Sequence, residues 1–231
     1  MELFNNLIYV KNSLDDTIIY NEHQYYRYMD KIYIPSPPSE LNINDVSSLS
    51  EIRIRLNGDV IDYDYTESVI ELIINNSDIK EDDYVIDFGC GGGTSFNVFS
   101  KLNIKLGKLI GLDISEFAVL TAEKVYSSDN ASASVFGDEA VIDAGDNSVD
   151  AVISSFVMHF NIYESQLKEL YRVLKVGGKF VYNDYVYHKY LGHSKRVIRM
   201  LEEQGFIVEQ EVVEFRAEGV IKKHLIVTAM K

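Results

Sequence analysis

Short apolar runs alternate with amphipathic stretches over residues 66 to 190, and this alternation dominates the pattern of the chain. Strand-like runs are expected at Tyr84 to Phe88, Lys108 to Ile114, Ala133 to Phe136, Val149 to Ser155 and Lys179 to Tyr187. Helical spacing is expected after the glycine cluster at 89 to 93, over Glu116 to Ser127 and over Gln166 to Leu174. Such alternation predicts an α/β fold: a doubly wound, mostly parallel sheet with helices on both faces.

The carboxyl-terminal part of the chain has a different order of elements. A helix over Ser194 to Gln204 is expected to end at Gly205. Two strand-like runs follow, Phe206 to Phe215 and Val220 to Met230, joined through Ala217-Glu218-Gly219. This pattern predicts an antiparallel hairpin that closes the sheet.

The first 65 residues have the character of an extension rather than of a second domain. They are rich in tyrosine, and they hold all three prolines within residues 35 to 38, so Ser36-Pro37-Pro38-Ser39 is the expected linker. Tyrosines 20, 25, 26, 28 and 33 have helical spacing, which is typical of a core but also suits a lid whose rings enclose a substrate. We therefore expect a helical lid over residues 1–65 and a catalytic domain over residues 66–231.

Composition indicates an ordinary globular protein of 231 residues, with 25% charged and 46% apolar residues and room for one main core. The sequence contains neither an apolar run long enough to span a bilayer nor a basic segment followed by an apolar stretch at its start. Cys90 is the single cysteine, which excludes an intramolecular disulfide and favours a reducing compartment. The cytoplasm is the expected location, with no membrane association.

The net charge is −14, with 22 basic and 36 acidic residues, and no basic cluster offsets it. Phosphate backbones would be repelled over most of such a surface, so nucleic acid is not expected as a substrate. The acidic surface is interpreted as a solubility feature before any steering of cationic substrates. No cluster of histidine, cysteine and acidic residues suggests a metal site, and the sequence does not indicate an oligomeric state.

A glycine-rich turn follows the first strand-like run, in the sequence Val85-Ile86-Asp87-Phe88-Gly89-Cys90-Gly91-Gly92-Gly93-Thr94. A ligand must approach the backbone of such a turn closely. The dinucleotide fingerprint would need glycine at 94, and a phosphate-binding P-loop would need lysine followed by serine or threonine after the last glycine. Neither phosphate-binding pattern is met.

The spacing Asp87-x-Gly89-x-Gly91-x-Gly93 resembles the cofactor loop of class I S-adenosylmethionine-dependent methyltransferases. Three further motifs resemble the family in the same order along the chain: residues 109 to 115, the stretch 146 to 155 that contains Ser154, and residues 169 to 178, where Val176 replaces a usual proline. The resemblance covers residues 66 to 190, with the terminal hairpin matching in topology. It implies a seven-stranded sheet, S-adenosylmethionine as cofactor and a methyltransferase activity.

The resemblance also implies which residues contact the cofactor. Asp87 would hold its ammonium group, and Gly89, Gly91 and Gly93 would let its methionine part lie against the loop, beside Ser154 on the fourth strand. Asp113 would accept both ribose hydroxyls, Ile114 would pack on the adenine, and Asp138 or the neighbouring Glu139 would accept from the adenine amino group. Aspartates also cap turns and helices without a ligand, so a purely structural role for Asp87 and Asp113 stays open. Cys90 is expected to be a small filler rather than a nucleophile.

Catalytic and substrate residues are less well marked. His159 follows the fourth strand, where this fold faces the methyl group, and is either a general base or a residue that holds a helix start. Tyr26 of the lid is the second candidate for taking a proton. Further substrate contacts are expected, together with Asp184, at the following positions: Tyr20, Tyr25, Tyr28, Tyr185 and His188.

The expected reaction is an in-line methyl transfer to nitrogen, oxygen or carbon of a small molecule. An alternative of the same fold is a cyclase or lyase that releases methylthioadenosine, as in azetidine-forming cyclases, with the tyrosine-rich region sealing a pocket too small for a second substrate. A third interpretation is a protein that binds the cofactor and acts through a partner. The acceptor itself cannot be read from the sequence, because loops at strand ends vary between activities.

Overall fold

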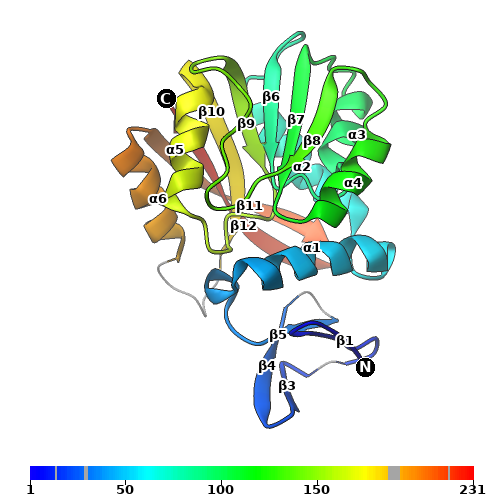
Figure 1. Cartoon of the computed structure of the whole chain (residues 1–231). Coiled ribbons are helices and arrows are strands. Elements are labelled where there is room, and N and C mark those ends of the chain that lie inside the picture. Colours follow the sequence, from blue (N-terminus) through cyan, green and yellow to red (C-terminus); the bar gives the residue numbers. More distant parts are fainter. Residues whose placement is uncertain (14, 29–30, 187–192, 218) are drawn as a thin grey trace.

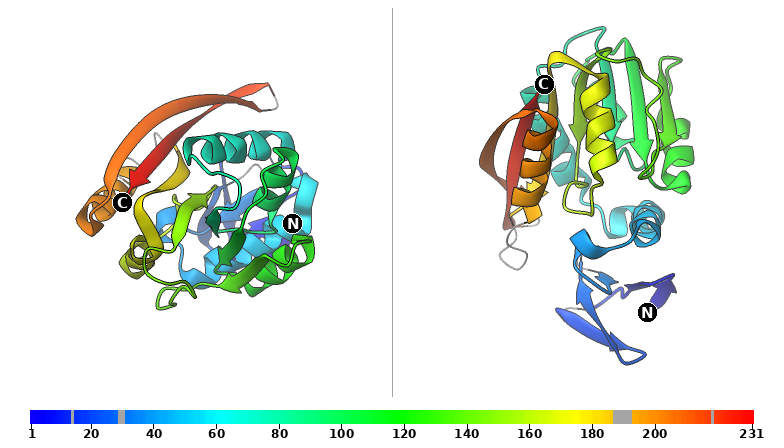
Figure 2. Two further views of the ribbon diagram at one scale, coloured as in Figure 1. Left: turned by 90° about the horizontal axis from the view of Figure 1, so that it is seen from above. Right: turned by 60° about the vertical axis from the view of Figure 1, so that its left-hand side comes forward.

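The computed structural model describes residues 1–13, 15–28, 31–186, 193–217 and 219–231. Its centre is a seven-stranded sheet in the order β11-β12-β10-β9-β6-β7-β8 (Figure 1). The strands are β6 (Tyr84–Phe88), β7 (Lys108–Asp113), β8 (Ala131–Val135), β9 (Val149–Ser154), β10 (Leu174–Tyr185), β11 (Ile207–Ala217) and β12 (Val220–Met230). Neighbours among β8, β7, β6, β9 and β10 pair in parallel, whereas β12 is antiparallel to both β10 and β11. The predicted sheet and its hairpin are confirmed (Figure 2).

Helices cover both faces of this sheet because the strands carry apolar side chains on both sides. The helices are α2 (Tyr63–Asn76), α3 (Thr94–Lys101), α4 (Glu116–Val125), α5 (Glu164–Val173) and α6 (His193–Gln204). Ile86 and Phe88 of β6 belong to the cluster under α5 and α6, while Val85 belongs to the cluster under α2, α3 and α4. Alternate residues of one strand thus serve two cores, as a doubly wound fold requires. None of the helices in the described ranges is long and apolar enough to cross a bilayer.

Predicted element boundaries agree with the structure to within a few residues. The run from Tyr84 to Phe88 matches β6, while β10 begins earlier than expected, at Leu174. Tyr187, the expected end of that strand, lies outside the described residues. The expected linker at Ser36 to Ser39 leads into a short 3₁₀ turn, η1 (Pro38–Glu40), and a second one, η2 (Asn57–Asp59), precedes α2.

The amino-terminal segment corrects one expectation. Residues 2–34 form a small antiparallel sheet, ordered β1-β2-β5-β4-β3, instead of helices. Its strands are β1 (Glu2–Phe4), β2 (Leu7–Tyr9), β3 (Thr17–Tyr20), β4 (His23–Arg27) and β5 (Ile32–Ile34). Asn21 and Glu22 both have positive φ, 47° and 66°, which is the geometry of a tight hairpin turn between β3 and β4. The helical spacing of the tyrosines was therefore misleading, and alternation along short strands was the correct period.

One helix, α1 (Ile43–Leu56), lies between the small sheet and the carboxyl ends of the central strands (Figures 1 and 2). Asn42 caps its start, accepting hydrogen bonds from the backbone nitrogens of Asn44 and Asp45 at 2.9 and 3.0 Å. Leu49 and Ile52 of this helix pack in one cluster with side chains of the small sheet and with Phe160. The expected helical lid is thus correct for α1 alone.

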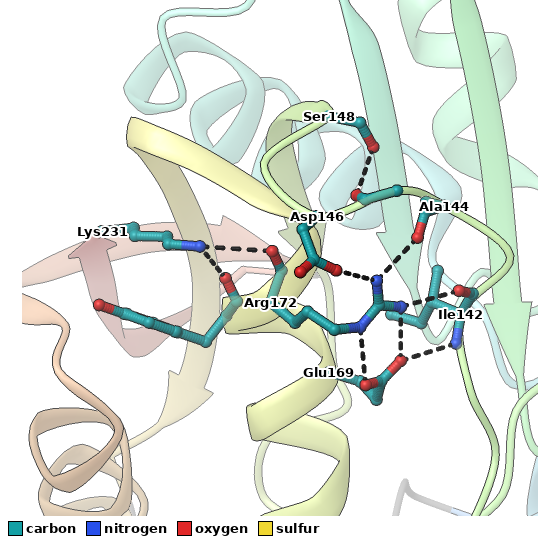
Figure 3. A network of polar contacts seen from close by, with 9 residues as sticks. Ile142, Ala144, Asp146, Ser148, Glu169, Arg172 and Lys231 are labelled. Atoms are coloured by element: carbon teal, nitrogen blue, oxygen red, sulfur yellow. Dashed lines mark hydrogen bonds and ion pairs between the residues drawn. The ribbon is translucent and has the colours of Figure 1, made fainter.

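At the opposite, amino edge of the central sheet, Arg172 ties α5 to the preceding loop (Figure 3). Its guanidinium donates to both carboxylate oxygens of Glu169 at 2.9 and 2.8 Å and to Asp146 at 2.8 Å. It also donates to the carbonyls of Ala144 and Ile142 at 2.9 and 3.0 Å. Beside it, the Lys231 amine donates to the carbonyl of Arg172 at 3.3 Å. The polar groups around Arg172 satisfy one another, which fixes the loop before β9.

Candidate functional site

A cleft runs along the carboxyl ends of β6, β7 and β9 under α1. Two adjoining hollows form it. The first is lined by Ser50, Arg53, Phe88, Gly89, Gly91, Leu112, Asp113, Ile114, Phe136, Phe156, Val157, Ile162 and Gln166, among others. The second is lined by Asp87, Gly89, Cys90, Gly91, Gly92, Thr94, Ser95, Ser155 and Phe156, among others. Ligands in open α/β sheets bind at this edge, so the cleft is the candidate site.

The glycine loop shapes the floor of the cleft. Gly89, Gly91 and Gly93 have φ of 82°, 51° and 85°, values that residues other than glycine rarely adopt. A Cβ atom at position 89 would overlap the side chain of Val157 across the cleft. The loop is anchored because the backbone nitrogens of Gly89 and Cys90 both donate to the Leu112 carbonyl, at 2.6 and 3.0 Å. Gly89 and Gly91 line the cleft, while Gly93 shapes the start of α3.

Asp113 ends β7 with its carboxylate at the cleft. The carboxylate accepts hydrogen bonds from the backbone nitrogens of Gly91 and Ser115, both at 2.9 Å, and a longer one from the Ser50 hydroxyl at 3.4 Å. Burial raises its pKa above the ordinary value, against the lowering effect of these hydrogen bonds. The side chain links three elements of the site and can still accept hydroxyl hydrogens from the cleft.

Asp87 is buried at the end of β6, only 2% exposed. The Ser95 hydroxyl donates to its carboxylate from the first turn of α3. Burial raises the pKa of Asp87 to about 7, with the Ser95 hydrogen bond opposing the shift. When a cation such as an ammonium group binds beside this carboxyl, its charge lowers the carboxyl pKa and favours the ionised form.

Other expected cofactor contacts lie at varied distances from the cleft. Ile114 lines it together with Leu112, Phe136 and Ile162, an apolar set suited to a flat base. Ser154 is fully buried and donates to the Phe88 carbonyl at 2.6 Å, so Ser155 rather than Ser154 reaches the cleft.

Asp138 and Glu139 are exposed and line neither hollow. Gln166 of α5 does line the first hollow, close to the turn that carries them, and its amide donates to the Gly137 carbonyl at 3.4 Å. A role for Asp138 or Glu139 at the adenine stays a prediction.

His159 is buried beside the cleft and pairs with a tyrosine of the amino-terminal segment. Its Nε2 lies 2.6 Å from the Tyr28 hydroxyl oxygen, and its Nδ1 has no hydrogen-bond partner within the described parts of the chain. The ring packs against Phe160 and Tyr185, with centroids 4.1 and 5.0 Å away. Burial holds the pKa of His159 well below its usual value, and the positive charge of Arg53 acts in the same direction. The imidazole is therefore neutral.

The structure separates the remaining tyrosine candidates. Tyr28 and Tyr185 line a further cavity beside the cleft. Tyr20 and Tyr25 pack edge-to-face within the small sheet, and Tyr26 points outward from β4 with 37% of its surface exposed. These three line none of the cavities described here. The expectation that Tyr26 takes a proton is not supported by its position, because strand alternation turns it away, and His188 lies outside the described residues.

Several residues of the site gave no signal in the sequence. Arg53 of α1 reaches the cleft and the further cavity, and Tyr65 of α2 pairs with His224 of β12. Phe156 has a φ of 59° and stands where the cleft and the cavity join. A lone arginine on the inward side of a helix that otherwise carries Ile43, Val46 and Leu49 was a possible clue. The others depend on contacts between distant segments.

Comparisons with known proteins agree with this geometry. Residues 86–182 match a family model described as a methyltransferase domain. A curated relative, the malonyl-[acyl-carrier protein] O-methyltransferase of Marinomonas sp. (strain MWYL1), is 32% identical over 122 residues, which are 52% of this chain and 44% of that protein. The chain thus spans less than half the length of that relative.

Solved structures share the fold. An S-adenosylmethionine-dependent methyltransferase from Aquifex aeolicus superposes with a TM-score of 0.55 at 24% identity, covering 82% of this chain and 99% of the other. The [4+2]-cyclase SpnF superposes with a TM-score of 0.66 at 14% identity, covering 84% of this chain and 98% of the other. At these identities the likeness concerns the fold.

The residues of the cleft fit S-adenosylmethionine chemically. Asp87 offers a carboxyl for an ammonium group, Asp113 an acceptor for hydroxyls, and the glycine loop a backbone surface that a Cβ at position 89 would obstruct. Leu112, Ile114 and their neighbours supply an apolar slot. Residues 86–182 of this chain thus match a methyltransferase domain, and the structure has the fold of solved S-adenosylmethionine-dependent methyltransferases, with a cleft whose residues fit that cofactor.

Proposed function

We propose that this protein transfers the methyl group of S-adenosylmethionine to a small-molecule acceptor. The observation that carries the proposal is a cavity of about 750 Å³ that shares Arg53 and Phe156 with both hollows of the cofactor cleft. That volume is in the range of small-molecule sites. The curated relative from Marinomonas is named as an O-methyltransferase of malonyl-[acyl-carrier protein], which supports a small acyl or comparable group as the methylated part of the acceptor.

The bound cofactor supplies a methyl carbon that its sulfonium has already activated, so the residues of the chain act mainly by alignment and by exclusion of water. Asp87, the glycine loop and Asp113 hold one side of the cleft, and Phe156 separates it from the acceptor cavity. No strong base is needed for an acceptor that already carries a negative charge.

A proton from a neutral acceptor has one evident route. Tyr28 lines the acceptor cavity, and its hydroxyl is hydrogen-bonded to the neutral His159 ring behind it. The Tyr28 oxygen would take the proton of the acceptor while its own hydrogen passes to Nε2 of His159. His159 would thus act through Tyr28 rather than by direct contact with the acceptor.

The cyclase or lyase alternative rested on a pocket too small for a second substrate, and the cavity beside the cleft speaks against that premise. The likeness to SpnF concerns the fold alone.

The test is incubation of the pure protein with methyl-labelled S-adenosylmethionine, with and without a small-molecule extract, followed by mass spectrometry. We expect S-adenosylhomocysteine and a labelled small molecule only when the extract is present. Methylthioadenosine from the cofactor alone, or label recovered only in macromolecules, would contradict the proposal. The absence of turnover by a protein that binds the cofactor, with every extract tested, would favour a role through a partner.

A further inference from the structure

The acceptor cavity has an unusual inner wall. Aromatic rings of Tyr28, Tyr65, Phe156 and Tyr185 line it, and the guanidinium-bearing side chain of Arg53 enters among them. These residues come from the amino-terminal segment, α1, α2, the turn after β9 and the end of β10. Aromatic rings beside the guanidinium of Arg53 suit a ligand with a planar apolar body and an anionic end.

Arg53 makes no salt bridge among the described residues, and the carboxyl whose pKa its charge lowers is that of Asp113 in the cofactor cleft. Its Nε atom is buried and makes no hydrogen bond in the part of the chain that the structure describes. The other arginine of α1, Arg55, forms an ion pair with Glu51 at 2.7 Å. Among the same described residues, the Arg53 side chain forms no ion pair and no hydrogen bond. Its charge lies close to Tyr28 and Tyr185, since it opposes the burial effect that raises the pKa of each. A buried guanidinium nitrogen without a partner is costly unless a ligand supplies an acceptor.

The hydroxyl of Tyr65 belongs to a chain of hydrogen bonds behind the aromatic wall of the cavity. The backbone nitrogen of Phe156 donates to Oδ1 of Asn183 at 2.8 Å, which fixes the orientation of that amide. Nδ2 of Asn183 must then donate to Nδ1 of His224, 3.0 Å away, because an amide nitrogen cannot accept. Nε2 of His224 is hydrogen-bonded to the Tyr65 hydroxyl, and the Asp184 carbonyl also accepts a hydrogen bond from the His224 ring. The Tyr65 ring is thereby held in place beside Arg53 in the wall of the cavity.

Other charges around the cavity agree with the positive charge of Arg53. Lys222 stands over the Tyr65 ring, with Nζ 4.6 Å from the centroid. The acidic residues of the lining, Asp59, Asp62 and Asp64, belong to η2 and the start of α2; Asp59 and Asp64 are exposed, and Asp62 caps α2 through the Tyr65 nitrogen at 3.1 Å. An ammonium group would meet Arg53 and Lys222 on the inner side, so a cationic acceptor is disfavoured.

We propose that this cavity takes an acceptor that carries a carboxylate on a flat apolar body, with Arg53 pairing with the carboxylate and the aromatic rings of the wall packing on the flat body. The inference rests on the proposed function, because it assigns the substrate class of that same site.

The experiment uses the whole protein saturated with S-adenosylhomocysteine and three matched probes: benzoate, its neutral amide benzamide, and benzylamine. Binding is measured by ligand-observed NMR titration. We expect benzoate to bind at least about tenfold more tightly than either other probe, because a charge-assisted bidentate pair gains more than neutral contacts do. Equal binding of benzylamine, or no preference among the probes, would overturn the inference.

Variants test the role of Arg53. Arg53→Met should remove the preference for benzoate, and Arg53→Lys should keep part of it. Arg55→Met, on the same helix but exposed, is the matched control and should leave all three probes unchanged. Thermal unfolding confirms that each variant is folded.

Titration of S-adenosylhomocysteine into the same variants distinguishes this inference from the proposed function. A change of less than about threefold in Arg53→Met would assign Arg53 to the acceptor. Strongly weakened cofactor binding with an unchanged benzoate preference would place Arg53 on the cofactor instead and overturn the inference alone. If the unmodified protein did not bind S-adenosylhomocysteine, the proposed function would fail, and the inference with it.

Discussion

Arg172 and Arg53 lie at opposite edges of the central sheet and differ in how far protein groups satisfy them. At the amino edge, Arg172 makes five hydrogen bonds to side chains and carbonyls around it (Figure 3). At the carboxyl edge, Nε of Arg53 and Nδ1 of His159 are buried without a partner in the described ranges, and burial raises the pKa of both Asp87 and Asp113. The hydrogen bonds of Arg172 stabilise the folded protein. The unpartnered buried atoms of Arg53 and His159 are groups to which a bound ligand can supply hydrogen-bond partners.

The largest effect is expected from Gly89→Ala, which places a Cβ against Val157 inside the cleft. We expect at least a 100-fold loss of S-adenosylmethionine affinity, measured by calorimetry, because the new methyl group narrows the cleft and strains a residue at φ 82°.

Gly177→Ala is the matched control for that change. Its φ is 81°, but nothing lies within 4 Å of the added Cβ, so it isolates the backbone strain, about 1 kcal/mol, from the obstruction. An affinity loss as large in Gly177→Ala would show that strain, not contact with the cleft, causes the effect.

Arg172→Met should lower the free energy of unfolding by about 2 kcal/mol, since several hydrogen bonds to a charged group are lost at a half-buried site. Cofactor affinity should not change, because the network lies at the opposite edge of the sheet. Lys223→Met, which removes an exposed pair with Glu214, should cost about 0.5 kcal/mol or less. Chemical denaturation measures the free energy of unfolding, and calorimetry measures cofactor affinity on the same samples. A loss of cofactor affinity in Arg172→Met would contradict the contrast between the two edges.

Cofactor binding should depend on pH through Asp87. Its pKa of about 7 in the free protein means that it is protonated below pH 7 and must lose that proton to pair with an ammonium group. The apparent Kd should therefore rise up to about tenfold per pH unit below 7, with proton release on binding in buffers of different ionisation heat. In Asp87→Asn this dependence should disappear. A flat Kd between pH 5 and 7 in the unmodified protein would exclude this role.

The raised pKa of Asp87 also makes the stability of the free protein depend on pH, and this stability falls with rising pH, whereas cofactor affinity rises. Because the folded-state pKa is raised above the unfolded value of 3.8, the neutral carboxyl stabilises the fold at low pH. That contribution falls as pH rises from about 4 to about 7, and Asp87→Asn should remove the loss.

A smaller effect on the turnover number is expected to distinguish Tyr28 from its neighbour Tyr26. Tyr28→Phe should lower the turnover number with a neutral acceptor by about tenfold, because the contact between acceptor and His159 is broken. Tyr26→Phe, with its side chain outside the cavities, should leave turnover unchanged. Steady-state kinetics decides; equal effects would show that the small sheet acts on the site as a whole.

The sequence predicted which residues come together where the polar residues and the strand that carries them form one contiguous motif. Asp87 lies near the end of a buried strand that Gly89 and Gly91 follow, and Asp113 ends the next strand, so parallel pairing alone brings them together. The prediction failed for the segment before residue 35, because tyrosine spacing fits a helix on paper while paired Asn21 and Glu22 turn the chain into a hairpin. Arg53, Tyr65 and His224 meet only through packing of α1, α2 and β12, a relation that spacing along one chain does not encode.

The central claim is that the carboxyl edge binds S-adenosylmethionine through Asp113 and the glycine loop. Its most direct test is calorimetric titration of the cofactor into the unmodified protein, Asp113→Ala and the exposed control Asp129→Ala, with unfolding monitored in parallel. The account predicts binding to the unmodified protein and to Asp129→Ala, and a loss of at least about 100-fold in folded Asp113→Ala, because two charge-assisted hydrogen bonds disappear. Unchanged affinity in Asp113→Ala, or no binding to the unmodified protein, would contradict it.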